Sequence, residues 1–95
     1  MAAVSSTDRL IVPSGVVPRR VEARLVLLNA ETGRSFALDE IGARVWALIE
    51  GAERAGEVYA ALLDEYDVDA ATLTREVDAL IGRLEAEGLL EVCRE

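Results

Sequence analysis

Residues 27–46 read LLNAETGRSFALDEIGARVW, and this stretch predicts the change from sheet to helix on which the fold depends. Asn29 and Gly33 tolerate turn dihedrals and bracket a polar loop between two apolar runs, which is the pattern of a β-hairpin. From Asp39 the apolar spacing changes from two residues to three and four, and a carboxylate there can cap the free amides of a helical turn. The stretch therefore predicts a strand, a turn, a strand over residues 34–38 and a helix beginning at Asp39.

The segment before this stretch predicts a tail followed by two more extended runs. Residues 1–9 are small and polar, so we expect a disordered N-terminal tail. Short β-prone runs follow at residues 10–12 and 16–20, and Pro18 belongs on a sheet edge because it has no N–H to donate. Turn chemistry does not fix the first hairpin bend, which we place within residues 21–23.

Three helices are predicted after the sheet, at about residues 39–50, 54–65 and 70–87. Asp69 is placed to cap the third helix, and Gly88 ends it. Residues 89–92 then lie extended against the sheet or pack on the helices. The apolar faces at helical spacing are Ile41, Val45, Leu48 and Ile49 on the first helix, Val58, Tyr59, Leu62, Leu63 and Tyr66 on the second, and Leu73, Val77, Leu80, Ile81 and Leu84 on the third. Trp46 beside the first face is predicted to be core.

The order of strands before helices predicts an α+β fold. A short N-terminal antiparallel β-sheet followed by three α-helices joined by short turns is typical of a winged helix-turn-helix domain. The chain has 95 residues, of which 52% are apolar and 4% aromatic, and this predicts one domain with an aliphatic core.

The composition argues against an enzyme and against a nucleic-acid-binding protein. With 18 acids and 10 bases the net charge is −8, which opposes binding to a phosphate backbone. All ten bases are Arg, so the side chains that most often act as general base, neutral metal ligand or Schiff-base nucleophile are absent. Cys93 alone can form neither an internal disulfide nor a thiolate cluster. We therefore predict no catalysis, no cofactor and no metal site.

The sequence also predicts a cytoplasmic protein with no membrane partner. The apolar runs, such as residues 45–49, are far too short to span a bilayer. The N-terminus lacks a basic region followed by an apolar core, and one cysteine requires no oxidising compartment.

A binding module is the remaining class, because a strand at a sheet edge beside a helix groove can receive an extended peptide. The strand at residues 34–38 is the natural receptor, since Ser35 and Ala37 lie on one side of it and Phe36 and Leu38 on the other. The competing interpretation is that the chain's own N-terminal segment covers this edge.

Four stretches resemble successive landmarks of the PqqD family in their order and spacing. They are residues 27–34 (LLNAETGR), 38–46 (LDEIGARVW), 66–69 (YDVD) and 87–90 (EGLL). The resemblance extends over nearly the whole of residues 10–92, which we expect to form a PqqD-like peptide-recognition domain. Asp39 stands where the family usually has Asn, and Glu76 stands where it favours Asp.

The resemblance implies a RiPP recognition element, a non-catalytic domain that captures the leader segment of a ribosomally made precursor peptide. In that family the leader adds as a strand to the third strand and lies beside the third helix. Carried onto this sequence, the peptide-binding residues are Arg34, Ser35, Phe36, Ala37 and Leu38 on the strand and Glu76, Ala79, Leu80 and Arg83 on the helix. Ala79 would be a low floor, Leu80 an apolar wall, and Glu76 and Arg83 the charges that read leader side chains.

The resemblance leaves the pathway and the partner enzyme open. PqqD-like elements serve pyrroloquinoline quinone assembly, lasso peptide maturation and radical-enzyme pathways, and they present the leader to a modifying enzyme such as a radical SAM protein or to a leader peptidase. The alternatives are a structural subunit of a maturation enzyme and a helix-turn-helix regulator, although the acidic third helix reads DNA poorly. Exposed strand edges also permit a homodimer.

Overall fold

The computed structural model describes residues 4–22, 24–52 and 54–94. The elements in these residues are β1 (Arg9–Ile11), β2 (Val16–Val21), β3 (Arg24–Asn29), β4 (Ser35–Leu38), α1 (Glu40–Gly51), α2 (Ala55–Glu65), α3 (Ala70–Ala86) and β5 (Glu91–Cys93). The predicted α+β order of antiparallel strands followed by three helices is confirmed. One strand, β5, comes after the helices and adds to the predicted architecture.

β2, β3 and β4 form a three-stranded antiparallel sheet in that order. The first hairpin bends after Val21, where Glu22 has a φ of 57°, within the three residues that the sequence indicates; Ala23 lies outside the described residues. The second hairpin turns at Gly33, whose φ of 75° is one that glycine adopts without strain. Pro18 lies on β2, an edge strand of this sheet, as predicted.

Caps define the ends of the helices. The Asp39 carboxylate accepts a hydrogen bond from the Gly42 amide at 2.8 Å, and the Asp69 carboxylate accepts one from the Thr72 amide at 3.1 Å. Both predicted caps are therefore confirmed. After α3 the chain passes through Gly88, whose φ is 75°. This left-handed residue turns the chain toward β5.

The N-terminal segment carries more structure than the sequence predicts. The Asp8 side chain is 2% exposed and accepts a hydrogen bond from the Ser5 amide at 2.9 Å. Among the described residues, no side chain caps α2; instead the Ala55 and Gly56 amides donate to the main-chain oxygens of Asp8 and Ser6 at 2.8 and 2.9 Å. Residues 5–8 are therefore a folded turn on α2, and not part of a disordered tail.

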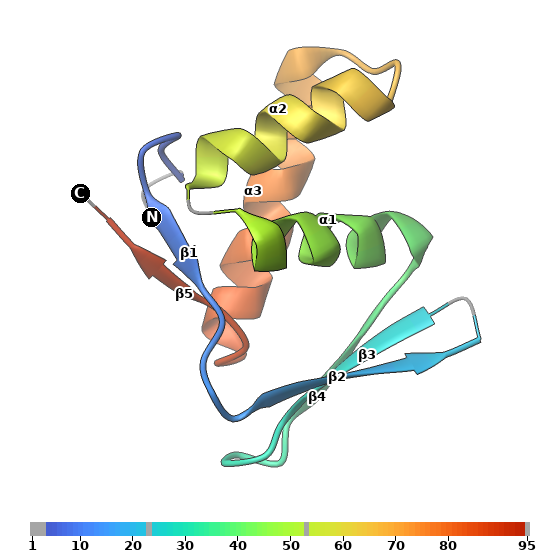
Figure 1. The fold of residues 1–95 in the computed structure, drawn as a ribbon, viewed down its shortest axis with the longest axis vertical. Helices are drawn as coiled ribbons and strands as arrows, with labels where there is room; N and C mark the ends of the chain where they lie inside the picture. Colours follow the sequence, from blue (N-terminus) through green and yellow to red (C-terminus); the bar gives the residue numbers. More distant parts are fainter. Residues whose placement is uncertain (1–3, 23, 53, 95) are drawn as a thin grey trace.

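A second sheet joins the two ends of the domain. β1 pairs with β5 in antiparallel register, with Leu10 opposite Val92. Figure 1 shows this pair beside the helices, with the three-stranded sheet below α1 and α3 crossing behind α1 and α2. Of residues 89–92, Leu89 and Leu90 are buried in the core, whereas Glu91 and Val92 are extended in β5 against β1.

The core lies between the helices and the inner faces of the sheets. Trp46 is 1% exposed, which confirms its predicted place in the core. Two residues of the predicted apolar helix faces lie on the surface instead, because Ile41 is 57% exposed and Leu63 is 41% exposed. None of the helices in the described residues is long and apolar enough to cross a membrane.

Candidate peptide-binding groove

The outer edge of β4 presents unpaired main-chain groups. The Asn29 amide donates to the Arg34 oxygen at 2.8 Å, and β3 pairs with β4 in unbroken antiparallel register from there to Leu25 and Leu38. Because antiparallel residues point their main-chain groups to alternate sides, Ser35 and Ala37 direct theirs away from β3. No strand of the described residues pairs with that side of β4.

The described part of the N-terminal segment, residues 4–12, does not pair with this edge. β1 pairs with β5, on a different sheet from β4. The competing interpretation of the sequence, in which the chain's own N-terminus shields the receptor strand, is therefore wrong for the described residues.

The opposite edge of the sheet is poorly suited to pair with another strand. By the same alternation the outward main-chain groups of β2 belong to Val16, Pro18 and Arg20. Pro18 has no N–H, and the Val16 amide already donates to the Pro13 oxygen at 3.1 Å. One of the two sheet edges is thus blocked, while β4 is left open.

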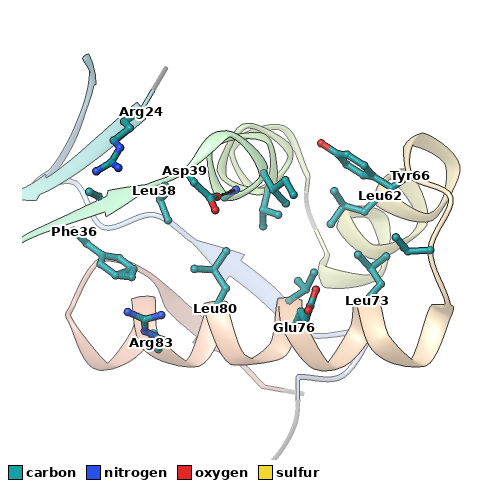
Figure 2. A pocket seen from close by; sticks show the side chains of 16 residues that line it. Arg24, Phe36, Leu38, Asp39, Leu62, Tyr66, Leu73, Glu76, Leu80 and Arg83 are labelled. Atoms are coloured by element: carbon teal, nitrogen blue, oxygen red, sulfur yellow. Dashed lines mark hydrogen bonds between the residues drawn. The ribbon is translucent and has the colours of Figure 1, made fainter. Parts of the chain in front are cut away.

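A groove of about 520 Å³ runs beside the open edge. Its walls are β4, the start of α1, the end of α2 and the face of α3 toward the sheet (Figure 2). The lining is mainly apolar and consists of Arg24, Phe36, Ala37, Leu38, Asp39, Ile41, Gly42, Val45, Leu62, Tyr66, Val68, Leu73, Glu76, Val77, Leu80 and Arg83.

Two side chains meet across the groove at one end. The guanidinium carbon of Arg83 lies 4.9 Å from the centroid of the Phe36 ring, which is cation–π geometry. Figure 2 shows Phe36 and Arg83 approaching each other from β4 and α3, with Leu80 pointing from α3 into the space between the walls. Glu76 lies further along the same helix, two turns from Arg83.

The structure brings together six of the nine predicted site residues. Those that line the groove are Phe36, Ala37, Leu38, Glu76, Leu80 and Arg83. Arg34 lies outside it, where its Nη1 donates to Glu87 Oε1 at 3.0 Å. Ser35 and Ala79 are exposed and do not line the groove, although Ser35 contributes to the open edge of β4.

Several lining residues were missed by reasoning from the sequence. Ile41 carries an apolar signal at helical spacing, but that signal does not distinguish a core face from a groove face. Gly42 permits close packing between β4 and α1, because a Cβ there would lie 3.1 Å from a methyl carbon of Leu38. Val68, which is 48% exposed, comes from a connector too short to show any pattern.

The charges of the groove are balanced, unlike those of the whole chain. Arg24 and Arg83 line it together with Asp39 and Glu76, whereas the net charge is −8. An extended ligand therefore meets two cations and two anions on an apolar background. No group of three or more His, Cys, Asp or Glu side chains in the described part of the chain could hold a metal ion.

Two polar pairs join neighbouring helices through residues that do not line the groove. Arg44 on α1 donates from Nε to Glu65 Oε1 of α2 at 2.8 Å, and this bond lowers the pKa of Glu65 and raises that of Arg44. The Tyr59 hydroxyl donates to the Asp78 carboxylate and so joins α2 to α3. Burial first, and then this hydrogen bond, raises the pKa of Tyr59.

A family model described as coenzyme PQQ synthesis protein D (PqqD) matches residues 24–90. The chain belongs to the PqqD family. All residues that line the groove lie within the matched range. The resemblance identified from the sequence is therefore confirmed, and the groove lies in the part of the chain that defines PqqD-family membership.

Two solved structures are similar to this PqqD-family chain. One, described as TbiB1 in complex with the TbiA(beta) leader peptide, is 35% identical with a TM-score of 0.77, and the match covers 84% of this chain and 93% of that one. The other, described as lasso peptide synthetase B1 complexed with the leader peptide, has a TM-score of 0.73 over 87% of this chain and 98% of that one. At 23% identity it supports the fold alone. No curated protein gives a significant match.

Proposed function

We propose that this protein is a non-catalytic RiPP recognition element, which captures the leader segment of a ribosomally made precursor peptide by strand addition to β4. It then delivers the peptide to a modifying enzyme, such as a radical SAM protein, or to a leader peptidase. Because precursor peptides are made on ribosomes, we place this step in the cytoplasm. Membership of the PqqD family and the leader-peptide complex of the 35% identical structure support the proposal.

The observation that carries the proposal is the position of the open edge beside the groove. An added strand would bond its main chain to Ser35 and Ala37, while every second side chain would enter the groove against Leu80 and Ile41. Main-chain bonds supply affinity without regard to sequence, and the groove selects side chains. Because Pro18 blocks the β2 edge, a peptide strand can add to this sheet at the β4 edge alone.

The charges predict which leader side chains are selected. Arg83 stands at one end of the groove, and Glu76 lies two helical turns away, about 10.5 Å along the axis at 1.5 Å per residue. We propose that a leader carboxylate contacts Arg83 and that a basic side chain, where the leader has one, lies near Glu76. Arg83 keeps its own charge accessible because it is exposed and stacks on an uncharged ring.

Charge reversal tests this selection one arginine at a time. We expect Arg83→Glu to weaken leader binding about tenfold or more, because a favourable contact becomes a repulsive one. Arg75→Glu is the matched control: it makes the same change in charge on the same helix, but Arg75 is exposed and does not line the groove. Equal losses for the two variants would show that overall charge, and not the groove, determines affinity.

The experiment that tests the proposed function is a titration of the ¹⁵N-labelled protein with the synthetic leader peptide encoded beside it, followed through backbone amide shifts. We expect the shifts to concentrate in residues 34–38 of the β4 segment and 76–83 of α3. Shifts confined to other surfaces would contradict strand addition at β4. No binding by any neighbouring leader would favour a structural subunit of a maturation enzyme or a regulator with another partner.

A further inference from the structure

We propose that Asn29 is a positioning residue for peptide binding, which fixes two walls of the groove, β4 and α3, relative to each other. The inference rests on the proposed function, because it concerns the same groove. Asn29 does not line the groove. From the sequence it has only the role of a turn residue, but the structure gives its side chain hydrogen bonds to two elements that lie far apart in the chain.

One end of the Asn29 side chain shapes the turn that leads into β4. Its Oδ1 accepts hydrogen bonds from the amides of Glu31 at 2.9 Å and Thr32 at 3.3 Å. The Asn29 main chain closes the same turn, since its oxygen accepts from the Gly33 amide at 2.8 Å. These bonds fix the direction in which the chain enters the receptor strand.

The other end of the side chain holds the end of α3. Asn29 Nδ2 donates to the main-chain oxygen of Gly88 at 2.8 Å, across 59 residues of sequence. Gly88 has the left-handed φ of 75° that turns the chain away from α3. Asn29 is 7% exposed, so this hydrogen bond is largely shielded from competing water.

Two further contacts join the same two walls and are weaker by their nature. Arg34 pairs with Glu87 at 3.0 Å, but their side chains are 61% and 39% exposed, and exposed ion pairs contribute little. Arg83 stacks on Phe36 inside the groove, where a bound peptide would compete for it. Asn29 is therefore the buried link among these three contacts.

The physical consequence is preorganisation. A peptide that adds to β4 must contact the strand and α3 at the same time, so any freedom between the two walls has to be lost on binding. With Asn29 in place that freedom is already restricted in the free protein. Loss of the link to Gly88 should lower peptide affinity even though no contacting residue has changed.

The test compares three variants. Asn29→Asp keeps an oxygen for the turn amides but places a second oxygen against the Gly88 carbonyl. Asn29→Ala removes both the acceptor for the turn amides and the donor to Gly88. Tyr59→Phe is the control, because it removes one hydrogen bond between α2 and α3 and leaves the contacts between β4 and α3 in place. Affinity is measured by fluorescence anisotropy with the labelled leader peptide encoded beside the chain, stability by urea unfolding, and the state of the free proteins by amide spectra.

We expect Asn29→Asp and Asn29→Ala to bind the leader about fivefold to tenfold more weakly, while Tyr59→Phe stays within about twofold of the unmodified protein despite its own loss of stability. In the free Asn29→Asp protein, amide changes should extend to residues 36–38 and 80–83. Unchanged affinity for the Asn29 variants, or an equal loss for Tyr59→Phe, would overturn the inference.

Failure of the proposed function would be seen separately, because the unmodified protein would then bind no leader. The spectra of the free proteins would still decide the inference in that case. Changes confined to residues 29–34 in Asn29→Asp would show that Asn29 serves only its own turn, whereas changes that also reach residues 80–83 would support a link between the walls.

Discussion

Replacement of Ala37 by proline tests strand addition at its centre. Ala37 directs its N–H to the open side of β4 and gives no hydrogen bond to β3. A proline there removes the outward donor and places its ring where a peptide carbonyl would approach. The fold should survive, because an edge strand tolerates proline and the preceding residue, Phe36, is already extended.

The expected loss of peptide affinity follows from the two residues of β4 whose main-chain groups point outward. Ser35 and Ala37 each offer one N–H and one C=O, so the substitution removes one of two outward donors. Loss of that bond costs about 1 kcal/mol, and a peptide carbonyl left without a partner costs about 1–3 kcal/mol more. A total of roughly 2–4 kcal/mol corresponds to affinity about 30-fold to 900-fold weaker.

The control is a proline on the opposite edge of the same sheet. Arg20 on β2 also points its main chain outward, so Arg20→Pro imposes a similar backbone change away from the groove. Arg20→Ala accounts for the lost charge. Anisotropy titration with the leader peptide measures affinity, and circular dichroism with urea unfolding verifies the fold. Retention of leader affinity within about threefold by a folded Ala37→Pro protein would refute strand addition at β4, because that loss is below 1 kcal/mol.

Three further predictions concern stability and use urea unfolding followed by tryptophan fluorescence. Gly82→Ala should stabilise the protein by about 0.5–1 kcal/mol, because a Cβ there meets nothing within 4 Å and alanine favours helix. Gly56→Ala should destabilise the protein, because the new Cβ would lie 3.1 Å from Ser6. An equal gain in stability for both variants would show that the turn at residues 5–8 moves away from the new methyl group without cost. Because the pKa of Tyr59 is raised in the folded protein, the unfolded chain loses the phenolic proton at a lower pH than the folded chain does. The contribution of Tyr59 to the free energy of unfolding is therefore fully present below about pH 10 and should decline above it. Tyr59→Phe should reduce that decline, by up to about 1.4 kcal/mol per pH unit, and parallel alkaline curves for the two proteins would contradict the assignment.

Local chemistry made much of this fold predictable from the sequence. Asp39 and Asp69 cap helices through bonds to amides only three residues away, so the signal and its partner lie in one short segment. The first hairpin bend was also found, although no Gly, Asn or Pro marks it. Here the apolar runs on either side limited where the chain could turn.

Long-range contacts explain what the sequence did not reveal. Residues 5–8 are ordered because two of their main-chain oxygens accept bonds from the start of α2, and their side chains carry no apolar signal for that contact. The pairing of β1 with β5 joins segments about 80 residues apart, and three residues on each side are too few to specify a partner. Asn29 shows the same limit, since its bond to Gly88 has no local signature.

The groove itself shows why a binding site can be mistaken for core. Ile41 has the spacing of a core residue on α1 and is 57% exposed, so it contributes an apolar side chain that the free protein leaves without cover. A chain selected for stability alone would close such a groove and would protect both edges of its sheet. Here the edge at Pro18 is blocked and the edge beside Ile41 is left open. Exposed apolar side chains and unpaired main-chain groups therefore lie side by side. An extended peptide needs both to bind, whereas selection for stability alone would bury the one and pair the other.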